Sequence, residues 1–158
     1  MRKFFFGLGV FAAFVIVAGG LGFYVLARNG NALDSASKAY VEESVVAIAA
    51  NWDVDELWKR ASPRLRTSAK PDEIRGLFDA AKGALGPLVD YRGSQGEAMM
   101  SLQNATPAVS AQYVANCSFQ KGNAEIRVTL VKQGDTWMIQ GFHINSTALM
   151  QRLVGVRS

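Results

Sequence analysis

Few side chains in this chain are suited to acid–base chemistry, and the clearest candidate is His143, the only histidine. It falls in a predicted strand from Thr136 to Ile144. If Trp137 and Ile139 face the core, the two-residue period of a strand places His143 on the same side, where an imidazole can carry a proton. A core histidine that only bonds a backbone group would give the same pattern. His143 is therefore a candidate without an assigned role.

Cys117 is the only cysteine, so the chain has no intramolecular disulfide. It alternates with polar residues in a predicted strand, which is typical of a buried, inert thiol. A nucleophilic thiol would want a cationic or histidine neighbour, and the local sequence has none. One cysteine and one histidine without clustered carboxylates do not form a metal-ligand pattern. We predict no metal site, no cofactor and no catalytic set, and a non-enzymatic role is favoured.

A second candidate is a run of basic residues between Leu57 and Pro71 that contains no acid. Its members are Lys59, Arg60, Arg64, Arg66 and Lys70. Such a run can bind phosphate groups or an acidic partner. It can also be the solvated face of a short helix and the loop that follows it, which is a common arrangement.

The overall charge argues against nucleic acid as a partner. The chain carries 17 Lys and Arg against 13 Asp and Glu, a formal net charge of +4. Without Arg2 and Lys3 at the N-terminus the surplus falls to two. A nucleic-acid-binding domain would concentrate many more basic residues on one face.

The first 27 residues are predicted to form a membrane anchor. From Phe4 to Leu26 the chain runs for 23 residues without a charge. A helix of this length reaches about 35 Å, and the hydrocarbon core of a bilayer is about 30 Å thick. Because Arg2 and Lys3 precede the segment, the positive-inside rule places the N-terminus in the cytoplasm. We expect an inner-membrane protein of a bacterium, with the remaining chain in the periplasm or outside the cell.

A cleaved signal peptide is the alternative for the same segment. Its apolar core would span about 7–15 residues, which is shorter than the stretch present here. The sequence leaves open whether the segment is removed.

After a polar linker over residues 28–36, helical signals continue to about residue 86 in a domain that spans 37–158. Apolar residues recur at helical spacing over about 37–51. Asp53 and Glu56 have the form of a capping box that starts a short second helix. Pro71 begins a third helix, and Gly86-Pro87 ends it.

The second half of the domain changes to the two-residue period of strands. Alternating runs start at Val109, Ala124 and Thr136, and short turns connect them. A less regular strand covers Leu88 to Leu102, and a short helix could end the chain. Because each strand follows its neighbour through a tight turn, we expect an α+β domain with an antiparallel sheet and helices on one face.

This order resembles the cystatin-like or nuclear-transport-factor-two-like superfamily of cone-shaped domains. The resemblance rests on Val41-x3-Val45-x2-Ile48-x3-Trp52, on Leu77-Phe78 with Gly86-Pro87, and on the strand pair 125–130 and 135–142. It covers roughly residues 37–145 and contains no signature motif. It therefore implies about three helices on a curved antiparallel sheet, and it implies no activity, because members range from isomerases to scaffolds.

Within such a cone, a ligand site would need polar groups that converge inside it. The resemblance implies His143, Tyr113, Asp90 and Tyr91 as the candidate lining.

Two functional hypotheses follow. The first is a membrane-tethered interaction or assembly module of the bacterial envelope, which binds a protein partner or self-associates. The second is a small-molecule binding domain or enzyme that uses the cavity of the cone. A binder should have an open pocket with convergent polar groups, whereas a scaffold should have a filled cone and an exposed patch.

Overall fold

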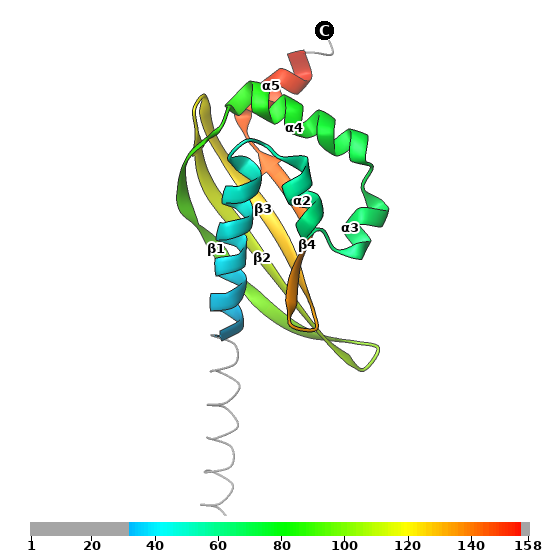
Figure 1. Cartoon of the computed structure of the whole chain (residues 1–158). Helices are drawn as coiled ribbons and strands as arrows, with labels where there is room; N and C mark the ends of the chain where they lie inside the picture. The colour runs from blue at the N-terminus through cyan, green and yellow to red at the C-terminus, as the bar shows by residue number, and fades with distance from the viewer. Residues whose placement is uncertain (1–31, 156–158) are drawn as a thin grey trace, which may run out of the picture. The chain divides into compact units, whose positions relative to one another are not determined.

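The computed structural model describes residues 32–155. The chain divides into two compact units, residues 1–35 and residues 36–158. The second unit carries the helices and the sheet described below (Figure 1).

The prediction of a membrane-spanning helix, and with it of a single-pass inner-membrane protein, is corrected by this structure. Within residues 32–155, no helix combines the length and the apolar character that crossing a membrane requires. The predicted span, Phe4 to Leu26, lies outside the described residues.

In the part of the chain that the structure describes, four helices precede the sheet, where about three were expected. The first is described over 32–49, so the last residues of the predicted linker are helical. The second is α2 (Val54–Arg60), for which the Asp53 carboxylate accepts a 2.9 Å hydrogen bond from the backbone N–H of Asp55. The third, α3 (Pro63–Ser68), falls where a loop was expected. Ser62 starts it by accepting a 3.2 Å bond from the N–H of Leu65.

The longest helix after these is α4 (Pro71–Leu85), and both of its ends are as predicted. Pro71 occupies the first turn, where its missing N–H costs nothing. Gly86 ends the helix with a φ of +74°, a backbone conformation that residues other than glycine rarely adopt.

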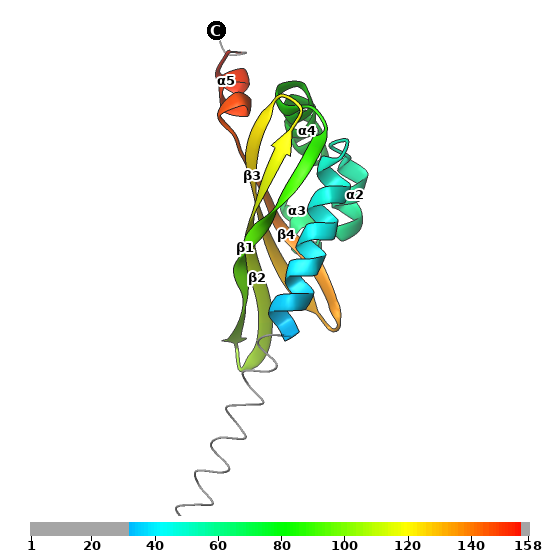
Figure 2. The ribbon, with the colours of Figure 1, turned by 90° about the vertical axis from the view of Figure 1, so that its left-hand side faces the viewer.

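The sheet has four antiparallel strands in chain order, β1-β2-β3-β4. They are β1 (Leu88–Gln103), β2 (Thr106–Phe119), β3 (Gly122–Gln133) and β4 (Thr136–Asn145), and α5 (Thr147–Gly155) follows the last strand. The first four helices lie against one face, which we call the inner face (Figure 2). The helix α5 packs against α4, and the opposite, outer face of the sheet is exposed.

The inner face is packed with apolar side chains from the sheet and the helices. The fully buried ones include Ile48, Leu57 and Phe78 from helices and Ile126 and Ile139 from strands. Their burial removes apolar area from water, which is the main favourable contribution to folding.

Aromatic rings form the centre of this core. The indole of Trp52 stacks on Phe119 with ring centroids 5.1 Å apart and meets the edge of Phe78 at 5.8 Å. Phe78 in turn lies 5.9 Å from Phe142 of β4. This chain of rings joins the helical layer to both β2 and β4.

Two irregularities of the sheet decide where functional side chains lie. In β4, Ile139 pairs with Leu130 and Gly141 pairs with Thr129, so Gln140 is an extra residue in a β-bulge. At the end of the sheet that contains the turn between β1 and β2, β2 pairs with β3 only from Val109 onward, whereas β1 and β2 stay paired up to Gln103 and Thr106. The end of the β1–β2 hairpin therefore extends beyond the β3–β4 hairpin as an arm of two strands (Figure 1).

Candidate functional site

His143 lies on the outer face of the sheet and is exposed, which differs from the orientation inferred from the two-residue period. The cause is the bulge at Gln140, because one extra residue moves every later side chain to the opposite face. Phe142 therefore takes the inward position and contacts Phe78. Directly across the sheet, His143 pairs with Arg127 of β3.

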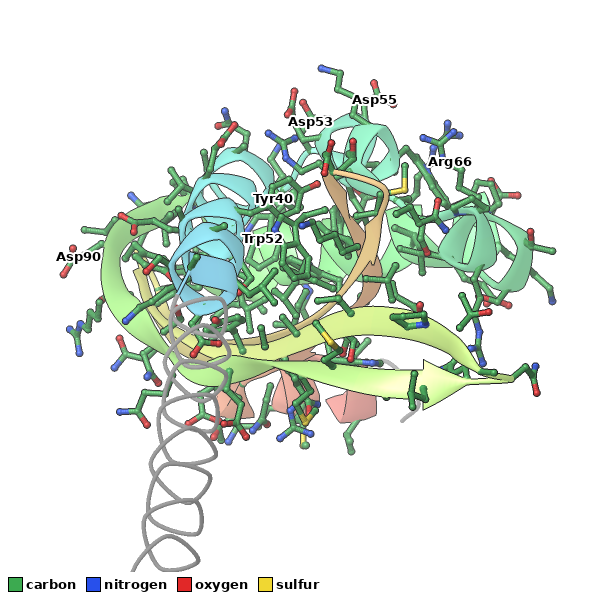
Figure 3. All side chains as sticks on the ribbon, turned by 90° about the horizontal axis from the view of Figure 1, so that it is seen from below. Tyr40, Trp52, Asp53, Asp55, Arg66 and Asp90 are labelled. Carbon is green, nitrogen blue, oxygen red and sulfur yellow. The ribbon has the colours of Figure 1, made fainter. Side chains whose placement is uncertain are left out.

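The other three predicted lining residues do not join His143. Tyr113 faces the core, where its hydroxyl lies 2.9 Å from Ser37 Oγ. Tyr91 is half-buried, and burial raises the pKa of its hydroxyl above the usual value. Asp90 points away from β1 into solvent, with a carboxylate oxygen 3.9 Å from Nε of Arg92 (Figure 3). Tyr91 and Tyr113 thus lie on the inner face, whereas Asp90 and His143 lie on the outer face, and among the described residues the four line no common pocket.

The basic run is largely neutralised by neighbouring acids. Lys59 and Arg60 both pair with Glu56, and Arg60 also approaches Glu43 at 3.9 Å. These hydrogen bonds lower the pKa of the Glu56 carboxyl. Lys70 pairs with Glu73 at 3.3 Å.

The two remaining members of the run have different surroundings. Arg66 donates a 2.7 Å bond to the carbonyl oxygen of Trp58, and Arg64 is exposed on α3. The charges of the run therefore do not converge on one point, as an anion site would require.

Cys117 is buried on the inner side of β2. Burial raises the pKa of its thiol to about 11, with a smaller contribution from the Asp90 carboxylate. Since the thiolate is the reactive form, this cysteine is poorly suited to nucleophilic chemistry. Within residues 32–155, no three His, Cys, Asp or Glu side chains lie close enough to hold a metal ion.

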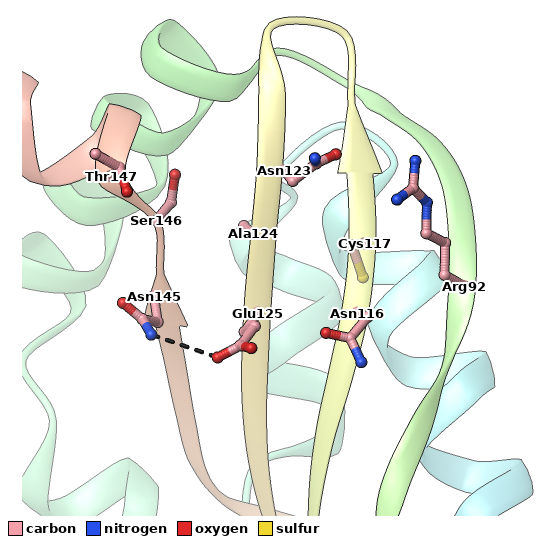
Figure 4. Close-up of a pocket in the computed structure, with 9 residues that line it drawn as sticks. All are labelled: Arg92, Asn116, Cys117, Asn123, Ala124, Glu125, Asn145, Ser146 and Thr147. Carbon is pink, nitrogen blue, oxygen red and sulfur yellow. Dashed lines mark hydrogen bonds between the residues drawn. The ribbon is translucent and has the colours of Figure 1, made fainter.

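The outer face of the sheet carries three hollows that share lining residues. The first, of about 420 Å³, lies beside the start of α5 and contains Glu125 and Asn145 (Figure 4). A second, of about 160 Å³, shares these two residues and adds Arg127 and His143. A third, of about 450 Å³, shares Arg127 and reaches Glu97 on β1. Together they form a continuous surface depression, which we call the outer trough.

The side chains of the outer trough are mainly hydrogen-bonding groups. In the first hollow, the amide of Asn145 donates a 3.4 Å bond to the Glu125 carboxylate (Figure 4). Arg92, Asn116 and Asn123 surround this pair. Among the described residues, no Phe, Tyr or Trp lines any of the three hollows, so the imidazole of His143 is the one aromatic ring in the trough.

The hairpin arm carries the second notable surface. Met100 pairs with Val109 and Leu102 pairs with Pro107, and all four side chains lie on the inner face. The first rung lies at the last pair of β2 with β3, and the second lies beyond it. Met100 is 65% exposed and Leu102 is 76% exposed. Met99 on the opposite side of the arm is 50% exposed and lines the third hollow of the outer trough.

The turn at the tip of the arm holds this hairpin in register. Asn104 and Ala105 both have positive φ, 51° and 62°, as a two-residue type I′ turn requires. The turn twists in the same sense as the strands, so the two strands stay paired up to Gln103 and Thr106.

Neither the outer trough nor the arm was singled out from the sequence, although both leave a signal in it. Polar residues at alternate positions of the strands, such as Asn116, Glu125 and Arg127, indicate a solvent-exposed face of the sheet. Such a face is ordinary for an antiparallel sheet. Met99, Met100 and Leu102 depart from the strict alternation of polar and apolar residues in a strand beside a turn. Apolar side chains therefore lie on both faces of this strand, and some of them are exposed. Neither signal says which positions adjoin in space.

Comparisons with protein-family models, with curated proteins and with solved structures gave no match. The resemblance to the cystatin-like superfamily therefore stays a prediction.

Proposed function

We propose that residues 36–155 act as a protein-interaction module in which the hairpin arm contacts a partner polypeptide. The observation that carries this proposal is a pair of apolar rungs at the end of the sheet: Met100–Val109 lies at the last pair of β2 with β3, and Leu102–Pro107 lies beyond it on the arm. Soluble proteins seldom expose neighbouring large apolar side chains unless something else covers them.

The energy available from covering the arm is appreciable. Full burial of a Leu or Met side chain is worth about 1.5–3 kcal/mol, and most of the Met100 and Leu102 surface is still exposed. The adaptable methionine side chains also suit a contact surface. Two such residues side by side can therefore anchor a partner, as the central residues of an interface do.

The alternative function, a ligand site inside the cone, has less support. Two of its four candidate residues, Asp90 and His143, lie on the outer face. Aromatic rings from α4, β2, β4 and the turn before α2 occupy the centre of the inner face. We keep the cystatin-like or nuclear-transport-factor-two-like relationship as a proposal about the fold alone. The order of helices followed by an antiparallel meander supports it.

A photo-crosslinking experiment in cells that naturally make the protein tests the arm. We would place a benzophenone amino acid at Pro107, which is exposed on the same face as Met100 and Leu102, in the full chain, and at Arg75 on exposed α4 as the matched control. We expect a discrete adduct from position 107 and none of the same mass from position 75. The double substitution Met100→Gln and Leu102→Gln should reduce the adduct at least about tenfold, because it removes the apolar anchor.

The folding of the double variant needs its own measurement. Because both side chains are exposed, its urea midpoint should stay close to that of the parent. If the adduct persists in a folded double variant, or if positions 75 and 107 give the same adducts, the arm is not the contact element and the proposal fails.

A further inference from the structure

We propose that Lys132 selects the partner of the hairpin arm, which is a polypeptide segment with an acidic side chain next to its apolar anchor residues. This inference rests on the proposed function, that the arm contacts a partner polypeptide, and adds the charge that the partner carries at one place. The occupant is a different protein and not a second copy of this chain.

Lys132 lies on the same face as the apolar rungs and directly beside them. It pairs with Val109 of β2 on one side and with Trp137 of β4 on the other. Because residues paired across strands point to the same face, this row of the inner face reads Met100, Val109, Lys132 and Trp137. Neighbouring strands lie about 4.8 Å apart, so the lysine adjoins the first apolar rung without an intervening residue.

The arm itself carries no charge. From Ala98 to Gln120 the chain contains no Asp, Glu, Lys or Arg. The other charged residues of β3, Glu125 and Arg127, face outward, because each pairs with an outward residue of β2. A partner that covers the rungs therefore meets one charge on the inner face of β2 and β3, and this charge is positive.

The ammonium group of Lys132 is available to a partner. Among the described residues no carboxylate forms an ion pair with it, and this includes Asp135, the nearest acid along the chain. Its Nζ lies 6.0 Å from the centroid of the Trp137 ring, which is the outer limit of a cation–π contact. That contact uses none of the three N–H donors of the ammonium group in a hydrogen bond.

Covering Val109 changes the surroundings of this charge. Lys132 is already half-buried, and a partner on the neighbouring side chain removes more of its water. Burial of a charge without an opposite charge is costly. An Asp or Glu of the partner offsets this cost, whereas a Lys or Arg there adds repulsion. The rungs therefore supply affinity, and the lysine discriminates between partners.

Other occupants fit this place less well. Two copies of the arm placed against each other would bring both Lys132 ammonium groups into an interface to which residues 98–120 contribute no acid. A nucleic acid is disfavoured because one lysine beside apolar side chains does not make the row of cations that phosphates require. Residues three or four apart on a helix, or two apart on a strand, lie about 5–7 Å apart. We therefore expect the partner's acid within about four residues of its apolar anchor.

Charge variants of Lys132 in the photo-crosslinking experiment test the inference. With the benzophenone at Pro107 of the full chain, Lys132→Glu should lower the adduct at least about fivefold, because repulsion replaces attraction. Lys132→Arg keeps the charge and should retain most of the adduct. Lys82→Glu is the matched control and should leave the adduct unchanged. Lys82 lies beside Gln120 and Lys121, at the opposite end of β2 from the arm.

The urea midpoint of each variant separates a loss of binding from a loss of folding. If Lys132→Glu is less stable than the parent, Lys132→Gln takes its place. This variant removes the charge without introducing the opposite one, and it should lower the adduct at least about twofold.

A charge swap with the partner gives the decisive test. Mass spectrometry of the adduct identifies the cross-linked segment of the partner and its nearest acidic residue. Changing that acid to lysine should lower the adduct with the parent chain and restore it with Lys132→Glu. The adduct alone supports only the proposed function, whereas this restoration supports the inference.

The inference and the proposed function fail in different ways. Equal adducts from the parent and Lys132→Glu, an equal loss in Lys82→Glu, or a charge swap that restores nothing overturns the inference and leaves the arm as the contact element. Lack of an adduct specific to position 107 rejects the proposed function and the inference with it. A dimer in sedimentation that Met100→Gln with Leu102→Gln dissociates would place a second copy on the arm, which also overturns the inference.

Discussion

The indole N–H of Trp52 donates a 2.8 Å hydrogen bond to the carbonyl oxygen of Gly86, and this bond joins two residues with unusual backbone conformations. Trp52 has a φ of +53° and Gly86 has a φ of +74°. One ends the turn after the first described helix and the other ends α4. Left-handed backbone in a bulky residue costs free energy, so the surrounding contacts must hold it in place. The bond and the stacking on Phe119 are those contacts.

Replacement of this indole should therefore be costly. Trp52→Phe removes the hydrogen bond, leaves the Gly86 oxygen without its donor and opens a cavity beside Phe119. We expect the free energy of unfolding to fall by about 2–4 kcal/mol. Urea denaturation followed by circular dichroism measures it. Trp58→Phe on α2, where the side chain is only half-buried, is the control and should cost less than half as much. Equal losses would mean that the bond contributes nothing.

A glycine at the tip of the hairpin arm should increase the stability of the domain. Ala105 has a φ of +62°, and the left-handed conformation costs an alanine about 1–2 kcal/mol. Ala105→Gly relieves this cost but adds entropy to the unfolded chain, so we expect a net stabilisation of about 0.5–1 kcal/mol. Thermal unfolding would measure the gain. Ala108→Gly, in the extended part of the same arm, should destabilise instead. A loss of stability in Ala105→Gly would contradict the type I′ turn.

An interior glycine of α4 offers a second stabilising change. A side chain at Gly76 would meet nothing within 4 Å, and the residue lies in the middle of the helix. Gly76→Ala should raise the free energy of unfolding by about 0.5–1 kcal/mol, because alanine loses less backbone entropy on folding. Gly83→Ala is the comparison. Its new methyl group would displace the Arg152 guanidinium, so its gain should be smaller. The measurement is the urea midpoint of each variant.

The stability of the domain should fall as the pH rises from about 9 to 11. In the folded state burial raises the pKa of Cys117 to about 11, from an ordinary value of 9.0. The unfolded chain therefore loses its thiol proton at a lower pH, which favours unfolding above pH 9 and has no effect below it. Urea midpoints across this range should fall more steeply for the parent than for Cys117→Ala. Parallel curves would mean that the thiol does not titrate differently in the two states.

Local signals in the sequence were sufficient for most element boundaries. Asp53 before α2, Pro71 at the start of α4 and Gly86 at its end act through bonds and φ angles within a few residues. The strands were recognisable from alternation for the same reason. By contrast, α3 was missed, because a six-residue helix started by Ser62 and Pro63 leaves too short a periodic pattern to read.

The candidate surfaces depend on contacts between distant residues. Arg60 is neutralised partly by Glu43 of another helix, which no local pattern connects to it. Likewise the Ser37 hydroxyl meets that of Tyr113, 76 positions away. The arm became visible only when the register showed β3 ending its pairing at Val109.

By itself, the sequence determined the order of helices and strands and the antiparallel meander, because hydrophobic period, caps and tight turns act over a few residues. The tertiary structure alone decided which face each functional side chain occupies. The bulge at Gln140 exists because this stretch of β4 has one residue more than the stretch of β3 with which it pairs. It is therefore a property of the pairing of two strands and not of either strand alone. It moved His143 out of the core and placed it beside Arg127 on the outer face of the sheet.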